Sequence, residues 1–253
     1  MDLDDFGAGG AFILGGSGGL GSAICAAFAR AGAPVAFSYN SNRDAADRTA
    51  EAIRACGVEA RACQLDASDR AAVFAALDHA ADALGGLHSV VYAGGPTFTP
   101  EFFSRTEESV WRDWLDQDVM GAINLAQAAL PHLRRTSGSF TSISTYQGEM
   151  VEVRGAPSAI AKAAVDRMVK VIAKEEGRYG VRANSLRCGW IGVDLVERLF
   201  ATMPGMREEK QRRIPLGRVG RAEEVAQTIL FLSSRRAGFI TGVNLTADGG
   251  ESL

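Results

Sequence analysis

Short β-rich runs alternate with longer segments of helical periodicity from one end of the chain to the other. Strands joined through helices pair in parallel, because each crossover returns the chain to the same end of the sheet. A parallel sheet is buried under helices on both faces. The pattern therefore predicts an α/β fold of three layers around a doubly wound parallel sheet. The expected strands are 11–14, 34–38, 60–65, 89–92, 139–144, 182–186 and 243–247.

The segments between these runs carry apolar residues at helical spacing. In the helix expected to end at Leu84, Val73, Leu77 and Leu84 fall on one stripe, and Ser68 is the expected N-cap. The irregular stretch 192–215 predicts a mobile substrate lid or a surface helix pair, and the two interpretations are compatible. No linker, repeat or charge run divides the chain, so we expect one domain over 1–253. The other expected helices are 21–31, 43–56, 107–133, 157–177 and 222–232.

Composition excludes several classes of protein. With 47% apolar and 23% charged residues, the chain is too hydrophobic for intrinsic disorder. The net charge of −3 indicates no basic surface for nucleic acid. No apolar run reaches the roughly 20 residues of a membrane span, and residues 1–6 lack the basic start of a signal peptide. The four scattered cysteines include no C-x-x-C pair, which argues against a zinc site or a secreted disulfide framework and favours the reducing cytoplasm.

A glycine-rich segment, LGGSGGLG at positions 14–21, follows the first expected strand and opens the first expected helix. Glycine allows a tight turn there, close approach of a pyrophosphate to the main chain, and close packing of helix on strand. The N-terminus of the helix adds N–H donors and partial positive charge. The segment therefore predicts a dinucleotide site on a Rossmann-type sheet.

The end of the second expected strand bears on the choice of dinucleotide. A site for NAD(H) would place an Asp or Glu there to accept from the ribose 2′-hydroxyl, and none is present at 38–42. Instead, Tyr39, Asn40, Ser41 and Arg43 offer groups that suit a 2′-phosphate. This favours NADP(H) over NAD(H). The alternative for Arg43 is a solvated residue at a helix start.

These motifs lie where the classical short-chain dehydrogenases/reductases have theirs, and the chain resembles that family over essentially its whole length. The glycine segment is similar to their T-G-x-x-x-G-[IL]-G, with Leu14 in place of Thr, and VYAG at 91–94 takes the place of N-N-A-G. RANS at 182–185, CGWI at 188–191, IPLGR at 214–218, ITG at 240–242 and ADGG at 247–250 match further signatures. The cofactor-binding positions that the motifs and this resemblance indicate are Gly15, Ser17, Gly18, Gly19, Leu20, Gly21, Tyr39, Asn40, Ser41, Arg43, Asp66, Ala67, Ala93, Gly94, Gly95, Lys162, Gly189 and Ile191.

The resemblance also implies a catalytic tetrad of Asn, Ser, Tyr and Lys, in which the Tyr hydroxyl transfers a proton. Lys162 is kept, whereas Ser158 stands at the Tyr position, Thr145 at the Ser position and Asp118 at the Asn position. A serine hydroxyl is far less acidic than a phenol. Tyr146 and Asp118 are the candidates to supply the proton, directly or through a water. Their alternative roles are a half-buried loop tyrosine and an aspartate paired with Lys162.

Residues 157–166 together with Asp118 resemble the 2,4-dienoyl-CoA reductases, a branch that also lacks the tyrosine and binds NADPH. Those enzymes deliver hydride to a conjugated C=C bond of a thioester, and a bound water protonates the carbon. We therefore expect an NADP(H)-dependent oxidoreductase acting on a small enoyl, dienoyl or carbonyl substrate, acyl thioesters included. The alternatives are a catalytically silent nucleotide-binding subunit and a non-redox isomerase or lyase. The family resemblance further implies a homodimer or homotetramer.

Overall fold

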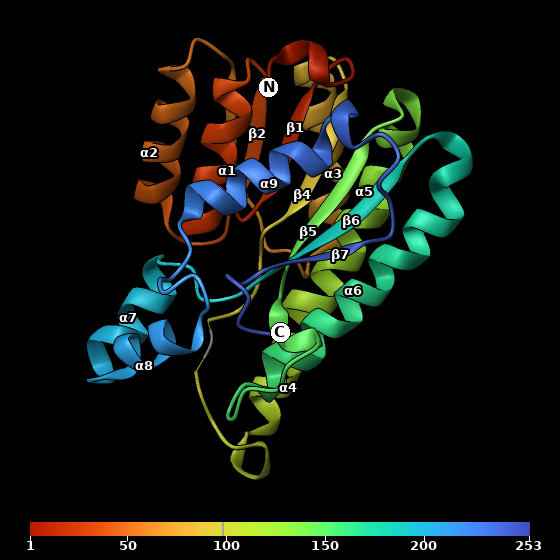
Figure 1. The fold of residues 1–253 in the computed structure, drawn as a ribbon. Helices are drawn as coiled ribbons and strands as arrows, with labels where there is room; N and C mark the ends of the chain where they lie inside the picture. Colours follow the sequence, from red (N-terminus) through yellow and green to blue (C-terminus); the bar gives the residue numbers. More distant parts are fainter. Residues whose placement is uncertain (98) are drawn as a thin grey trace.

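Seven parallel strands form one sheet in the order β3-β2-β1-β4-β5-β6-β7 (Figure 1). The computed structural model describes residues 1–97 and 99–253, apart from the side chains of residues 194 and 195. The strand order reverses direction between β1 and β4, and ligands of doubly wound sheets bind beyond the carboxyl ends of the strands at such a point. The predicted α/β fold is confirmed. The strands are β1 (Gly10–Leu14), β2 (Val35–Tyr39), β3 (Ala60–Gln64), β4 (Leu87–Tyr92), β5 (Ser139–Thr145), β6 (Arg182–Cys188) and β7 (Asn244–Ala247).

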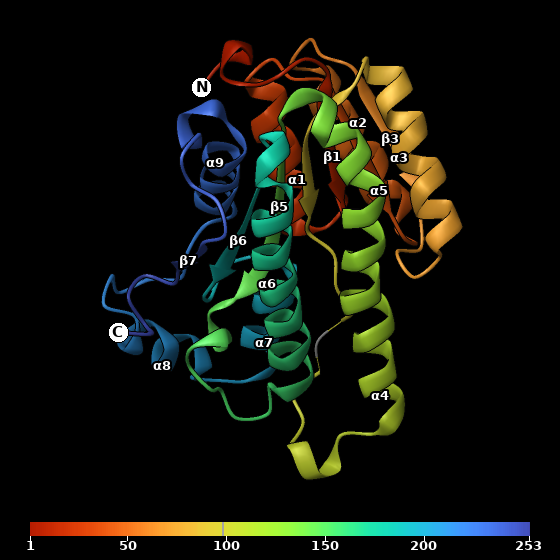
Figure 2. The same cartoon turned by 90° about the vertical axis from the view of Figure 1, so that its right-hand side faces the viewer.

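Helices cover both faces of the sheet, so the fold has three layers (Figure 2). One face carries α1 (Gly19–Arg30), α2 (Arg43–Arg54) and α9 (Ala222–Ser233). The other carries α3 (Arg70–Leu84), α5 (Gly121–Thr136) and α6 (Ala156–Glu176). The remaining helical segments are η1 (Leu3–Asp5), η2 (Phe103–Arg105), α4 (Glu108–Asp113), η3 (Trp114–Met120), η4 (Tyr146–Gly148), η5 (Gly177–Tyr179), α7 (Asp194–Thr202), α8 (Met206–Arg213) and η6 (Arg235–Ala237).

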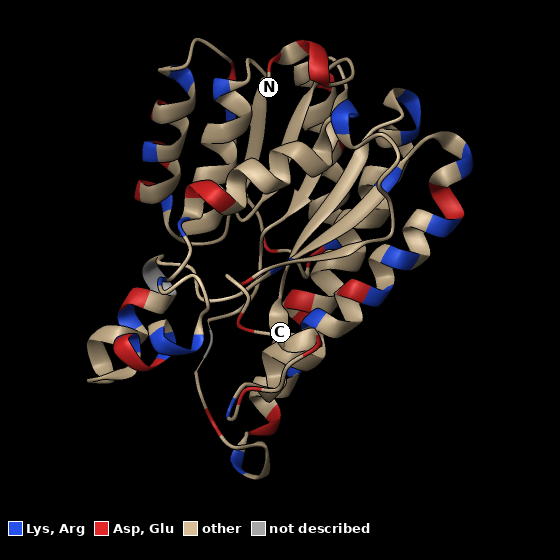
Figure 3. Cartoon of the chain, viewed as in Figure 1, with Lys and Arg blue, Asp and Glu red and all other residues tan. Residues whose placement is uncertain are grey.

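A hydrophobic core lies on each side of the sheet. Successive side chains of a strand point to opposite faces, so Phe12 packs into one core while Ile13 packs into the other. All five residues of β1 are buried, as the central strand of a parallel sheet requires. Charged residues lie mostly on helices and loops (Figure 3). The sheet is therefore buried between two apolar cores, although β5 and β6 also bury Ser, Thr, Asn and Arg side chains.

Two boundaries differ from the sequence-based expectation. The N-cap of α3 is Asp69, whose carboxylate accepts the Ala72 N–H at 3.0 Å, so the prediction of Ser68 was wrong. The Ser68 hydroxyl instead donates to Asp66 Oδ1 at 2.7 Å. The long helix expected over 107–133 consists of α4, the π-helical turn η3 and α5 in direct succession. A π-helical turn is often found at functional sites, because it changes which side chains a helix turns inward.

Residues 192–215 contain α7 and α8, so the predicted helix pair is confirmed, while its role as a lid stays a prediction. The two short helices lie apart from the sheet and close to the C-terminus in both views (Figures 1 and 2). In the described part of the chain, no helix is both long enough and apolar enough to cross a membrane.

Candidate functional site

The glycine segment forms a tight turn between β1 and α1. Gly15 has a φ of +83°, and the Gly18 N–H donates to the Gly15 carbonyl at 3.1 Å. A Cβ atom at Gly21 would lie 2.1 Å from the Gly15 carbonyl oxygen, so no side chain fits there. Gly18 is the N-cap of α1, whose N-terminus opens at this turn. The local geometry is therefore that of a helix start which can bind phosphate.

A cavity of about 230 Å³ lies over this turn. Gly15 and Gly18 of the turn and the acidic residue Asp66 line this cavity, which lies where doubly wound folds bind the phosphates of a dinucleotide. Its rim continues into a second pocket, because both cavities share Ala93, Gly94 and Gly95. The predicted cofactor-binding residues that line the first cavity are Gly15, Ser17, Gly18, Asn40, Asp66, Ala67, Ala93, Gly94 and Gly95.

The end of β2 offers polar groups without a carboxylate. Asn40 lines the first cavity, whereas Tyr39, Ser41 and Arg43 lie next to it in the chain and do not line it. The exposed Arg43 side chain lies 3.8 Å from Asp47. A weak ion pair between exposed groups of this kind leaves the guanidinium free to turn toward an anion.

The second pocket has a volume of about 310 Å³ and brings together four of the five predicted catalytic residues, Thr145, Tyr146, Ser158 and Lys162. Thr145 ends β5, and its Oγ1 accepts the Gln147 N–H at 3.3 Å, which leaves the hydroxyl hydrogen free to donate. Ser158 and Lys162 come from the first two turns of α6. Aromatic and aliphatic side chains form the other walls. The lining includes Leu20, Pro96, Trp114, Ile143, Tyr146, Gln147, Cys188, Gly189, Trp190, Ile191, Val193, Val196 and Leu199.

Asp118 lies behind this pocket, fully buried in η3, and forms an ion pair with Lys162. Lys162 Nζ donates to Asp118 Oδ1 at 2.8 Å and to the Gly94 carbonyl at 3.0 Å. The Tyr92 hydroxyl donates to the same Oδ1 at 2.8 Å. Burial, reinforced by the Asp118 carboxylate, raises the pKa of Tyr92 well above its ordinary value, so this phenol stays protonated. Asp118 Oδ2 is buried and has no hydrogen-bond partner among the described residues.

Tyr146 lines the pocket, but its hydroxyl is already hydrogen-bonded. It donates to Glu152 Oε1 at 3.0 Å and accepts from Trp190 Nε1 at 3.0 Å. Burial and the nearby Glu152 charge raise the pKa of Tyr146. Burial likewise raises the pKa of the Cys188 thiol to about 12, although the Lys162 charge opposes the change. Whether Tyr146 or Asp118 supplies a proton stays a prediction.

Sequence reasoning missed three residues of this site: Tyr92, Glu152 and Trp190. Tyr92 replaces an Asn of the N-N-A-G signature, and that departure was the one signal for it. Glu152 lies in a loop without periodicity, so nothing in the sequence indicates its partners. Two positions predicted for the cofactor, Gly19 and Gly21, act in the turn itself and line neither pocket, whereas Leu20, Gly189 and Ile191 line the second pocket.

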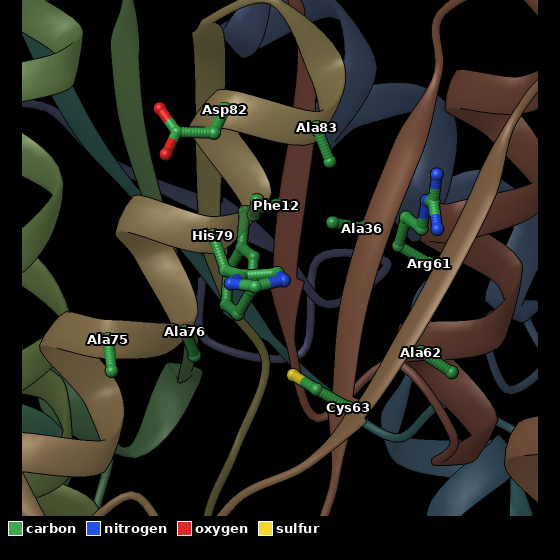
Figure 4. Close-up of a pocket in the computed structure, with 11 residues that line it drawn as sticks. Phe12, Ala36, Arg61, Ala62, Cys63, Ala75, Ala76, His79, Asp82 and Ala83 are labelled. Atoms are coloured by element: carbon green, nitrogen blue, oxygen red, sulfur yellow. The ribbon is translucent and has the colours of Figure 1, made fainter.

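A wider groove of about 790 Å³ lies elsewhere, between α3 and the edge of β2 and β3 (Figure 4). Alanine residues and Phe12 line it, and Asp82 points away from it in Figure 4. Arg61 and His79 at its rim are exposed. Cys63 and His79 also line this groove, but the glycine turn, Thr145 and Lys162 lie at the other two cavities, so the candidate site is the pair of cavities at the carboxyl ends of the strands.

Comparison with known proteins finds reductases and dehydrogenases in each case. A family model described as "Enoyl-(Acyl carrier protein) reductase" matches residues 15–252. The 3-oxoacyl-[acyl-carrier-protein] reductase FabG of Staphylococcus aureus is 30% identical over 241 residues, which cover 95% of this chain and 96% of the relative. The L-fucose dehydrogenase of Oryctolagus cuniculus is 32% identical, with 95% and 84% covered. A gluconate 5-dehydrogenase from Burkholderia cenocepacia J2315, solved in complex with NADP and tartrate, superposes with a TM-score of 0.90 at 26% identity and covers 100% and 96% of the two chains.

Proposed function

The chain belongs to the short-chain dehydrogenase/reductase family and is an NAD(P)H-dependent oxidoreductase, and on this basis we propose that it uses NADPH to reduce the activated C=C bond of an enoyl or dienoyl substrate. Acyl thioesters are the substrate class that we favour. We also propose that the protein acts in the cytoplasm, since its four cysteines are free thiols.

The observation that carries this proposal is that the two tyrosines nearest the site, Tyr92 and Tyr146, already donate their hydroxyl hydrogens to carboxylates. The chain has four tyrosines. Tyr92 donates to Asp118, and Tyr146 donates to Glu152. Tyr39 lies at the end of β2, and the exposed Tyr179 lies beyond the C-terminus of α6. Tyr146 is the tyrosine that lines the second pocket, and its hydroxyl is already engaged, so the site suits a reaction in which the proton is delivered to carbon.

The residues of the second pocket can assist that reaction. NADPH, when bound, supplies the hydride. Lys162 has one N–H left after its bonds to Asp118 and Gly94, and this N–H would bind the nicotinamide ribose. The Thr145 hydroxyl would donate to the thioester carbonyl oxygen. Negative charge develops on this oxygen when hydride is added to the carbon of the C=C bond that lies farther from the carbonyl. The unpartnered Asp118 Oδ2 would orient a water that protonates the carbon next to the one that accepts hydride, and the hydroxide left behind would take a proton from solvent.

Carbonyl reduction is the second candidate, and one observation favours it. The relatives named FabG and L-fucose dehydrogenase are a 3-oxoacyl reductase and a sugar dehydrogenase. In this case the Thr145 hydroxyl would be the group nearest to the substrate oxygen, and a water would replace the phenol as acid. The preference for NADPH over NADH rests on the end of β2, where no carboxylate would repel a 2′-phosphate.

The experiment is to titrate the protein with NADPH and NADH and then to follow absorbance at 340 nm with three groups of substrates: enoyl-CoA, 2,4-dienoyl-CoA and simple ketones. We expect NADPH to bind more tightly and to be oxidised with the conjugated thioesters. Lys162→Met should weaken NADPH binding and abolish turnover, whereas Lys170→Met, an exposed position on the same helix, should change neither. Oxidation with ketones alone would establish the carbonyl alternative. NADPH binding without turnover of any substrate would instead favour a silent nucleotide-binding subunit.

A further inference from the structure

Glu152, in the loop between β5 and α6, contacts three side chains through one carboxylate oxygen. Its Oε1 accepts from the Tyr146 hydroxyl, from Lys210 Nζ and from the Arg213 guanidinium, each at 3.0 Å. Lys210 and Arg213 belong to α8. Arg213 also lies 3.5 Å from Glu251 near the C-terminus. The carboxylate therefore holds a short helix against a wall of the second pocket.

The same contacts continue into the pocket through Trp190. The Trp190 indole N–H donates to the Tyr146 hydroxyl at 3.0 Å, and Lys210 Nζ lies 4.6 Å from the centre of its ring. The ring also stacks on Phe200 of α7, with 5.9 Å between centroids. Trp190 and Tyr146 both line the pocket. A change at Glu152 would consequently reach both aromatic walls.

The charges of α8 show why it needs this carboxylate. Met206 is the single apolar residue of the helix, so α8 has no apolar stripe with which to pack (Figure 3). Lys210 is nevertheless 5% exposed, and an ammonium group that far from water requires a partner. Glu152 and the Trp190 ring are that partner. Ion pairing therefore holds α8 in place, where most helices rely on apolar packing.

We propose that Glu152 is a positioning residue of the substrate pocket: it fixes Tyr146 and Trp190 as the pocket wall and holds α8 beside it. The contacts of Glu152 with Tyr146, Lys210 and Arg213 make up the Glu152 clamp. Its effect on substrate binding rests on the proposed function. The clamp assigns the Tyr146 hydroxyl to the wall of the pocket and leaves proton delivery to the side of Lys162 and Asp118.

Glu152→Gln is the sharpest variant, because the side chain keeps its shape and loses its charge. We expect KM for the conjugated thioester to rise roughly tenfold, about 1.4 kcal/mol, with kcat within about threefold of wild type. NADPH affinity should not change, since no clamp residue lines the nucleotide cavity. Amide hydrogen exchange over residues 206–213 should become faster, because α8 opens more often. Glu149→Gln is the matched control: it lies in the same loop and pairs with Arg187, outside the clamp.

Lys210→Met provides a second test with a different structural change. If the clamp acts as a unit, Lys210→Met should raise KM as Glu152→Gln does, and the double variant should be no worse than either single one. Wild-type KM and wild-type exchange in Glu152→Gln would overturn the proposal, as would equal effects in Glu149→Gln. The exchange measurement needs no substrate. A wild-type protein that reduces none of the compounds therefore refutes the proposed function, while exchange over α8 still decides whether the clamp exists.

Discussion

At the level of single residues, two departures from the family pattern lie in contact with each other. Tyr92 stands where the N-N-A-G signature has its second Asn, and Asp118 stands where the tetrad has its Asn. In the structure the Tyr92 phenol donates to the Asp118 carboxylate, so the two changes form one hydrogen-bonded group around Lys162. A buried lysine and a buried aspartate depend on each other, because either alone would be an uncompensated charge. The sequence indicates both positions but not their contact, which depends on how β4 and η3 meet.

His88 makes the stability of the fold depend on pH. It is buried in β4, where its ring stacks on Phe6 with 5.0 Å between centroids. Burial, and secondarily the charge of Arg235, lowers the pKa of His88 from 6.5 to about 4. In the unfolded chain, His88 is therefore protonated below about pH 6.5, whereas in the folded chain it is protonated only below about pH 4. Stability should be complete above pH 6.5 and fall as the pH drops toward 4, by roughly 3 kcal/mol at about 1.4 kcal/mol per pKa unit.

Urea unfolding at pH 7, 6, 5 and 4 measures this dependence. His88→Phe keeps a ring beside Phe6 and removes the titrating group, so its free energy of unfolding should fall much less between pH 6.5 and 4. The matched control is His79→Gln, an exposed position on α3, which should follow the wild-type curve. An unchanged acid-side slope in His88→Phe would contradict this assignment.

At the level of helices and strands, periodicity predicted the strands and the main helices. The residues at which these elements begin and end could be determined only from the structure. A cap depends on which side chain reaches a free N–H, and both Ser68 and Asp69 are good caps in sequence. Asp66 takes the Ser68 hydroxyl, which leaves Asp69 to cap α3. The sequence of η3, WLDQDVM, contains no Gly or Pro that would signal an interruption of the helix. Sequence therefore predicted one continuous helix and missed the turn that buries Asp118.

The assignment of the α3 cap can be measured. Asp69→Ala removes the acceptor of the Ala72 N–H and should lower the free energy of unfolding by about 1 kcal/mol. Ser68→Ala removes an exposed hydrogen bond to Asp66 and should cost at most about 0.5 kcal/mol. Chemical denaturation of both variants under one condition compares them. If Ser68→Ala were the more destabilising of the two, the cap assignment would be incorrect.

At the scale of the whole molecule, the two cavities form where α1, β2, β4, β5, β6 and α6 meet. The glycine turn and Lys162 were predictable because each lies in a motif with fixed spacing. The Glu152 clamp was not predictable, because Glu152 and its partners on α8 are far apart in the sequence and are brought together by loops.

The outer surface of the molecule carries exposed apolar side chains. Two sets of exposed apolar side chains lie on elements at the outside of the fold: Leu115, Met120, Ile160 and Val171 on η3 and α6, and Phe239, Val243 and Leu245 on and before β7.

We propose that these two surfaces join copies of the chain into a homodimer or homotetramer. β7 is an edge strand with an apolar side chain exposed, and such an edge is normally covered. α5 and α6 lie side by side on the outside of the molecule (Figure 2), so α6 can pack against the α6 helix of a second copy.

Light scattering after gel filtration should give two or four times the chain mass of 26.7 kDa. Leu245→Arg should reduce that mass by charging the edge, and Val171→Arg should do so at the other surface. Leu3→Arg, at an exposed apolar residue on neither surface, should keep the wild-type mass. A wild-type mass of 26.7 kDa at micromolar concentration would refute the assembly, and an assembly unaffected by both substitutions would place its contacts elsewhere.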